Sequence, residues 1–133
     1  MNNIKLVWEP KDVRTVLKPS CDIFIDGKSL SELINEIYHI DKYGPIECPD
    51  YPERYFYGYR EKYDEVRGKK AVVECKCGYG CGNVVTCKIV REDERIIWSD
   101  FVTVQGKKLV ELGNYVFDEL SYFNEVQTLS HYA

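Results

Sequence analysis

The sequence predicts an α+β fold in which an antiparallel β-meander sheet packs with two helices, at about residues 30–40 and 119–130. Both helical segments carry apolar residues at a spacing that places them on one face. Between them, short connections join three strand-like runs, which makes neighbouring strands antiparallel. These runs are residues 71–77, 81–90 and 95–104. The 133 residues contain no repeat, linker or low-complexity tract, so we expect a single domain spanning residues 1–133.

Two short strands are expected before the first helix. Residues 4–8 (IKLVW) and 21–27 (CDIFIDG) have strand-like composition, and the second run ends in an Asp-Gly turn signal. The helix then begins with a capping box, because Ser29 and Glu32 stand three residues apart. The Tyr-Gly-Pro sequence at residues 43–45 ends it. Its apolar face is formed by Leu30, Leu33, Ile34, Ile37 and Tyr38.

Residues 46–70 show no strand pattern and are rich in tyrosine. Four tyrosines are spaced four residues apart and would form one ridge on a helix: Tyr51, Tyr55, Tyr59 and Tyr63. Gly58 interrupts this segment, and a glycine costs a helix about 1 kcal/mol relative to alanine. We therefore expect a short helix or an ordered loop here.

The C-terminal part predicts a fourth strand and the second helix. Residues 108–112 (KLVEL) and 115–117 (YVF) have strand composition but are interrupted by Gly113 and Asn114. Asp118 is expected to cap the helix that follows, because its carboxylate can accept hydrogen bonds from free amides at a helix start. The expected inner face of this helix contains Leu120, Phe123, Val126 and Gln127.

Four of the six cysteines lie within residues 72–87 (VVECKCGYGCGNVVTC). Side chains alternate between the faces of a strand, and this alternation places all four cysteines on the side that carries the apolar residues. A Gly-Tyr-Gly turn at residues 78–80 would bring Cys77 close to Cys81 and Val73 close to Val85. Because free cysteine is among the most buried residue types, the favoured interpretation is a core role without metal.

Zinc binding is the alternative interpretation of Cys75, Cys77, Cys81 and Cys87. Four thiolates can hold zinc in a tetrahedron, and a glycine-rich turn can bring them together. Structural zinc sites usually use two separated Cys-x-x-Cys pairs, whereas these cysteines follow the pattern Cys-x-Cys-x3-Cys-x5-Cys. Redox catalysis is favoured less, since no Cys-x-x-Cys stands at a helix start to activate a thiol.

Several motifs resemble a family of small, largely uncharacterised bacterial proteins. They are CKCGYGC (residues 75–81), IIWSDF (96–101), YVFDELSYF (115–123) and FIDGKSLSELI (24–34). That family carries Cys-x-Cys-Gly followed by Gly-Cys, then a strand with a Trp-x-x-Phe-like element and an aromatic-Phe-Asp entry to the last helix. Its glycine–cysteine turn is one residue longer than the turn in this chain. The resemblance implies this fold and a bacterial, cytosolic setting, and it implies no activity.

Composition limits the classes of function. The formal net charge is −4 and the sequence pI is about 5.2, which argues against a general nucleic-acid binder because such proteins need a basic surface. The first residues show no signal peptide, and no apolar run is long enough to cross a bilayer. We expect a cytoplasmic protein without a membrane partner, whose cysteines are reduced.

No motif for catalysis stands out in the sequence. Nothing brings His39 and His131 to a common carboxylate or nucleophile. Gly-Lys-Ser at residues 27–29 lacks the earlier glycine of a phosphate-binding loop, since position 22 is aspartate. The sequence therefore predicts a protein that is not an enzyme and has no catalytic residues.

The tyrosine-rich segment is the main indication of function. Tyrosine is frequent at interfaces because its ring buries a large area at small entropic cost and its hydroxyl forms hydrogen bonds. Alternatively, some of these rings simply cover the sheet. The expected contact surface consists of Tyr51, Tyr55, Tyr57 and Tyr59, with Glu53 and Asp50.

These observations favour a non-enzymatic protein-binding domain, namely an immunity protein or antitoxin that neutralises a toxin by direct binding. The acidic chain suits a basic toxin domain, since complementary charge speeds association. A second hypothesis is a zinc-stabilised structural module that uses the four clustered cysteines. A third is a small domain of another role.

Overall fold

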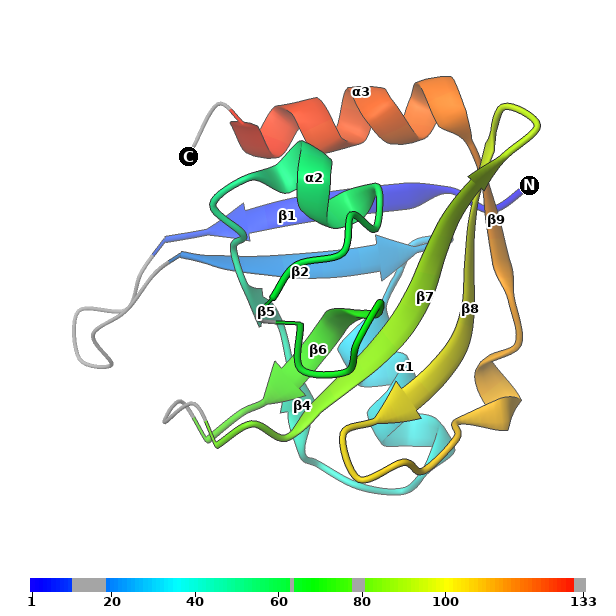
Figure 1. The fold of residues 1–133 in the computed structure, drawn as a ribbon. Coiled ribbons are helices and arrows are strands. Elements are labelled where there is room, and N and C mark those ends of the chain that lie inside the picture. Colours follow the sequence, from blue (N-terminus) through cyan, green and yellow to red (C-terminus); the bar gives the residue numbers. More distant parts are fainter. Residues whose placement is uncertain (11–18, 63, 78–80, 131–133) are drawn as a thin grey trace.

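The computed structural model describes residues 1–10, 19–62, 64–77 and 81–130. These residues form two antiparallel sheets with three α-helices, so the predicted α+β class is confirmed (Figure 1). The smaller sheet contains β1 (Ile4–Glu9), β2 (Ser20–Ile25), β3 (Lys28–Ser29) and β5 (Ile46–Glu47). The larger contains β4 (Tyr43–Gly44), β6 (Lys70–Cys75), β7 (Val84–Glu92), β8 (Arg95–Thr103) and β9 (Tyr115–Asp118). The helices are α1 (Leu30–Ile37), α2 (Pro52–Phe56) and α3 (Glu119–Ser130).

The predicted meander is confirmed in the larger sheet. Its strand order is β4-β6-β7-β8-β9, so the last four strands are neighbours in the order in which the chain visits them. The predicted fourth strand is shorter than expected, because residues 110–112 form a 3₁₀ turn and Gly113 has a φ of +67°. Tyr115–Asp118 forms the strand that pairs with β8, and of the earlier run Lys108 forms an isolated bridge to Val102.

The two sheets are joined at both edges, so the strands form a nearly closed ring around the core. At one edge Pro45 separates β4 from β5, and β4 pairs with β6 in one sheet while β5 pairs with β2 in the other. At the opposite edge, the backbone N–H of Asn2 donates a hydrogen bond to the Val116 carbonyl at 2.7 Å. The Asn2 side chain accepts a hydrogen bond from the Val116 amide at 2.8 Å. The sequence does not predict that the two sheets are joined at this edge.

The helices cover the two ends of the ring. Figure 1 shows α3 and α2 together at one end, with α3 beside β1, and α1 at the other end. The Leu6 amide of β1 donates to the Glu125 carboxylate of α3 at 2.7 Å, which fixes the helix to the strand. No helix among the described residues is both long and apolar enough to span a membrane.

The start of α3 is capped as predicted, because the Asp118 carboxylate accepts a hydrogen bond from the Ser121 amide at 3.0 Å. The predicted capping box of α1 is wrong. The Ser29 hydroxyl makes no cap bond and donates to Asp22 at 2.8 Å instead. The Asp-Gly turn before α1 is confirmed: Asp26 and Gly27 both have positive φ, of 54° and 84°.

The inner face of α3 differs from the predicted one. Tyr122, Val126 and Leu129 are buried, whereas Leu120 and Phe123 are exposed. Val126 was predicted on the inner face and is buried, whereas Tyr122 and Leu129 are buried in place of Leu120 and Phe123. The buried side chains recur at intervals of four and three residues. Tyr122 is therefore the side chain that enters the core from this helix.

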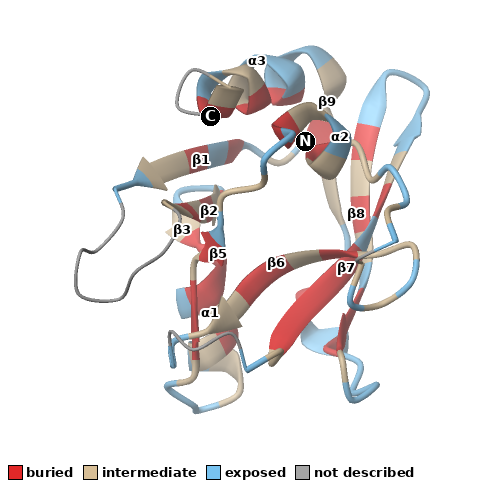
Figure 2. Ribbon diagram, turned by 60° about the vertical axis from the view of Figure 1, so that its left-hand side comes forward, coloured by how far each residue is buried: buried red, intermediate tan, exposed pale blue. Residues whose placement is uncertain are grey.

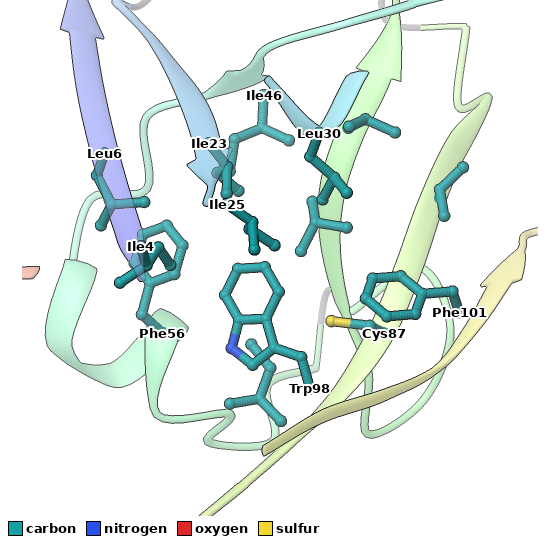
Figure 3. Packing of buried hydrophobic residues seen from close by; sticks show 14 of the residues in the cluster. Ile4, Leu6, Ile23, Ile25, Leu30, Ile46, Phe56, Cys87, Trp98 and Phe101 are labelled. Atoms are coloured by element: carbon teal, nitrogen blue, oxygen red, sulfur yellow. The ribbon is translucent and has the colours of Figure 1, made fainter. Parts of the chain in front are cut away.

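Trp98 of β8 lies at the centre of the core (Figure 3). Its ring stacks on Phe56 of α2 and meets Phe117 of β9 edge to face, with ring centroids 6.5 and 5.5 Å away. Its indole N–H donates to the Tyr122 hydroxyl at 3.0 Å, and that hydroxyl donates to the Phe56 carbonyl. One buried hydroxyl thus connects β8, α3 and α2.

Replacing Tyr122 with phenylalanine is expected to lower the free energy of unfolding by about 2–4 kcal/mol. The substitution keeps the ring but leaves the Trp98 N–H and the Phe56 carbonyl without their buried partner. Urea unfolding followed by tryptophan fluorescence measures the loss. Tyr59→Phe is the control, because Tyr59 is 56% exposed, and it should change stability by less than about 0.5 kcal/mol. Equal effects of the two variants would contradict this account.

Candidate functional site

The tyrosine-rich segment forms the short helix α2 and the turns on either side of it. Pro52 begins the helix, and the helix ends before Gly58, whose φ is +76°. A Cβ at Gly58 would lie 2.4 Å from the Ile89 carbonyl oxygen, so only glycine lets the chain pass this close to β7. The helix has only five residues, so it is too short to place the four tyrosines in the predicted ridge. Tyr63 lies outside the described residues.

The six predicted contact residues separate into two groups. Tyr51 is 66% exposed and Tyr59 is 56% exposed, and Asp50 is also exposed. The other three hold the fold together. The Tyr55 hydroxyl donates to the Ala71 carbonyl at 2.5 Å, and Tyr57 packs edge to face on Tyr122. Glu53 accepts hydrogen bonds from Gln127 at 3.0 Å and Ser130 at 2.6 Å.

A cavity of about 380 Å³ opens beside the start of α2. Tyr51 and Tyr55 contribute to its wall, together with Arg54 and Lys69. The rest of its charged lining is acidic. The carboxylates are those of Glu47, Asp50, Glu61, Asp64, Glu65 and Glu74. We call this feature the acidic cavity; it brings together parts of residues 47–55, 61–69 and β6.

The acidic side chains in this cavity lie in different environments. Glu47 and Glu65 are exposed. Glu61 pairs with Arg54 at 3.0 Å. Burial raises the pKa of the Glu74 carboxyl above its ordinary value, although it accepts a hydrogen bond from the Glu47 amide at 3.1 Å.

A buried ion pair lies between the acidic cavity and the core. Lys70 at the start of β6 contacts the Asp64 carboxylate at 2.7 Å, and their side chains are 1% and 4% exposed. The second Asp64 oxygen accepts a hydrogen bond from the Glu61 amide at 3.0 Å. The Lys70 ammonium also lies 5.3 Å from the centroid of the Tyr55 ring. This pair fixes Asp64, and through it Glu61, against β6.

The predicted core role of the clustered cysteines is correct only for Cys87. Cys87 is fully buried and Cys75 is half-buried, but Cys77 and Cys81 are exposed. The expected pairing of Val73 with Val85 is confirmed. However, β6 ends at Cys75 and β7 begins only at Val84, so strand alternation does not extend to Cys77 and Cys81. The Gly-Tyr-Gly turn at 78–80 lies outside the described residues.

Three of these cysteines form a cluster. The sulfur atoms of Cys75, Cys77 and Cys81 all lie within 4.8 Å of one another. The predicted proximity of Cys77 and Cys81 is therefore confirmed. The spacing of these residues is compatible with a metal ion. Cys87 pairs with Lys70, five residues before Cys75 on β6, and this separation corresponds to roughly 16 Å along a strand. It therefore does not belong to the cluster.

The histidines that the sequence analysis considered are not placed in either site among the described residues. His39 is exposed immediately after α1, and His131 lies outside the described residues. The sequence could not identify the acidic cavity, because its carboxylates are spread over residues 47–74 among many other charged residues. The sequence also gives no indication that Lys70 is buried. Lys70 follows Lys69, and two adjacent lysines are usually exposed to solvent.

Replacing Asp64 with asparagine is expected to lower the free energy of unfolding by about 3–5 kcal/mol, because it leaves the buried Lys70 charge without its partner. The neighbouring surface pair supplies a matched control. Lys69 contacts Asp100 at 2.6 Å, and the Asp100 side chain is 48% exposed. Asp100→Asn should therefore cost less than about 1 kcal/mol. Chemical denaturation of both variants makes the comparison, and a loss of similar size in each would show that burial of the pair is unimportant.

Comparison with known proteins adds no relative to these observations. No family model matches the chain, and no curated protein or solved structure matches it. The resemblance to the bacterial Cys-x-Cys-Gly family stays a prediction. The arguments for function therefore rest on the residues of this chain.

Proposed function

We propose that the protein is a non-enzymatic, cytoplasmic bacterial binding domain, an immunity protein or antitoxin that neutralises a basic toxin domain by direct contact. The observation that supports this most strongly is the acidic cavity with Tyr51 in its wall. A partner would place a lysine or arginine side chain in the cavity and pack its apolar surface on the exposed tyrosines. Charged residues supply the rate and specificity of such an association, and aromatic residues supply much of its affinity.

The shape and charge of the acidic cavity favour a basic side chain. Six carboxylates line it against two basic side chains, and even with Asp64 neutralised by Lys70 the acidic charges are in excess. Its volume of about 380 Å³ is at the lower end of the range for small-ligand pockets, which suits one or two side chains of a partner. The same acidic lining disfavours nucleic acid, whose phosphates require neutralisation by positive charge.

The binding surface is held in place before any partner arrives. Glu53 and Tyr55 of α2 are bound to α3 and β6, and Gly58 fits closely against β7. The exposed Tyr51 stands directly before this fixed helix, and the exposed Tyr59 follows Gly58 in the turn after it. A pre-organised surface loses less conformational entropy on binding, which improves affinity. The three tethered residues of the predicted contact surface therefore act by positioning, and the exposed three by contact.

The zinc-stabilised module, the alternative from the sequence, involves a different part of the molecule. Its thiols lie at the end of β6 and in the segment before β7, whereas the tyrosines flank α2. A metal there would stabilise the hairpin and would leave the contact surface unchanged. The two proposals are therefore compatible and can be tested separately.

The acidic cavity should bind arginine side chains in preference to acidic ones. Titration of ¹⁵N-labelled protein with a blocked Gly-Arg-Gly-Arg-Gly peptide should shift amide resonances around the cavity, with affinity falling as salt is raised. Lowering the pH should also weaken binding, because Glu74, with its raised pKa, gains a proton before an ordinary glutamate does. The glutamate counterpart of the peptide should produce no such shifts. Shifts of similar size on the opposite face would contradict the proposal.

Variants locate the binding to the cavity. The double substitution Glu47→Gln/Glu65→Gln removes two exposed carboxylates and should weaken arginine-peptide binding by about fivefold or more. Glu92→Gln removes a charge at the tip of the β7–β8 hairpin and should leave the affinity unchanged. If both variants bind equally well, the cavity is not the site.

The immunity proposal predicts that a gene beside the one for this chain encodes a basic toxin domain, and that domain is the partner used in the test. Co-expression should restore growth of cells that express the toxin domain, and the two proteins should bind in calorimetry. Tyr51→Ala/Tyr59→Ala should weaken that binding by about tenfold or more, because exposed aromatic side chains dominate such interfaces. Val110→Ala, another exposed apolar residue, is the control. Binding that is unaffected by the tyrosine variant would exclude this surface, and failure to restore growth would exclude the immunity role.

A further inference from the structure

We infer that Cys75, Cys77 and Cys81 form a zinc site in which three thiolates hold the ion and the fourth position is open to water. This inference goes beyond the binding role proposed above and does not depend on it. It also differs from the four-cysteine site considered from the sequence, because Cys87 is fully buried elsewhere on the hairpin. Within the described residues, the cluster consists of these three side chains.

The distances between the sulfur atoms suit a zinc ion. Zinc binds thiolate at about 2.3 Å in a tetrahedron, which places bound sulfur atoms about 3.8 Å apart. In this structure all three sulfur atoms lie within 4.8 Å of one another. An inward movement of a few tenths of an ångström per side chain would therefore complete the coordination, without any change of the strands.

The backbone on both sides of the cluster is fixed by hydrogen bonds. The Cys75 amide donates to the Asn83 carbonyl at 2.9 Å, and the Lys76 amide donates to the Lys42 carbonyl at 2.8 Å. Tyr43 of β4 lies opposite Cys75 in the sheet. Cys75 is thus held by the larger sheet, and the residue bonded to it, Asn83, stands two positions after Cys81. This fixed backbone reduces the entropy lost on metal binding.

A second layer of hydrogen bonds orients the cluster. The side-chain amide of Asn83 donates to the Cys81 sulfur at 3.4 Å. The side-chain oxygen of Asn83 in turn accepts a hydrogen bond from the Gln105 side-chain amide at 2.8 Å. Such outer partners orient metal ligands and are typical of built metal sites. An ordinary surface cysteine has no need of this chain of contacts.

The chemistry of three adjacent thiols favours a soft or borderline metal. Cys77 and Cys81 are exposed and therefore contribute little to the core. Thiolate ligands favour zinc over magnesium or calcium, which prefer oxygen. Three protein ligands leave one position of a tetrahedron free, and no fourth His, Cys, Asp or Glu of the described residues joins the cluster. Water is the ligand that would occupy this position.

Zinc titration of the full, reduced chain tests the inference. Competition with a chromophoric chelator should give one zinc ion per chain. Cys77→Ser and Cys81→Ser, at exposed positions, should each weaken the affinity by at least tenfold while circular dichroism stays unchanged. Cys48→Ser removes a half-buried thiol outside the cluster and should bind zinc like the unaltered chain. No zinc uptake, or equal losses in all three variants, would overturn the site.

Cobalt substitution tests the number of ligands. The thiolate-to-cobalt charge-transfer absorption of the unaltered chain should have the intensity of three thiolates, and it should fall by about one third in each variant that still takes up cobalt. An intensity of four thiolates would overturn the open position. Zinc binding can be measured without any protein partner, so a negative result here and a negative result for partner binding are independent of each other.

Discussion

The two hydrogen bonds of the buried Tyr122 hydroxyl are the interactions on which the rest of the structure depends. The hydroxyl accepts a hydrogen bond from Trp98 and donates one to the Phe56 carbonyl, so it joins the centre of the large sheet to both α3 and α2. A buried hydroxyl that satisfies two partners fixes direction as well as distance. The position of α2 follows from this contact, and the positions of Tyr51 and Tyr59 follow from α2. Figure 2 shows the buried residues of β6 and β7 below α2 and α3 in that view.

The elements with strong local signals could be predicted from the sequence. The last helix has the predicted limits, residues 119–130, because its aspartate cap and helical spacing are both local. The two strands around the cysteines also pair as predicted. The capping box at Ser29 was wrong because Asp22, on the neighbouring strand, takes the serine hydroxyl. A tertiary contact of this kind is invisible in a short window of sequence.

The sites depend on longer-range features, which explains why the sequence predicted them only in part. A bulge between Ala71 and Val73 interrupts the alternation in β6, and both Val72 and Val73 are buried. Strict alternation therefore could not assign the cysteines beyond it. The acidic cavity depends on the position of Glu61 and Asp64 beside β6, which the buried Lys70–Asp64 pair holds. Neither lysine nor aspartate is commonly buried, so composition alone assigned both to the surface.

The closure of the strand ring has a consequence for how the chain folds during synthesis. Asn2 is bonded to Val116, and Leu6 to Glu125, so contacts at the two ends of the sequence complete the structure. Contacts this distant in sequence carry a large loop-closure entropy and slow the folding of a small domain. Asn2 and β1 cannot gain their contacts with β9 and α3 until residues 116–125 have left the ribosome. Until then the growing polypeptide exposes the apolar side of its first strands, and chaperones can bind it.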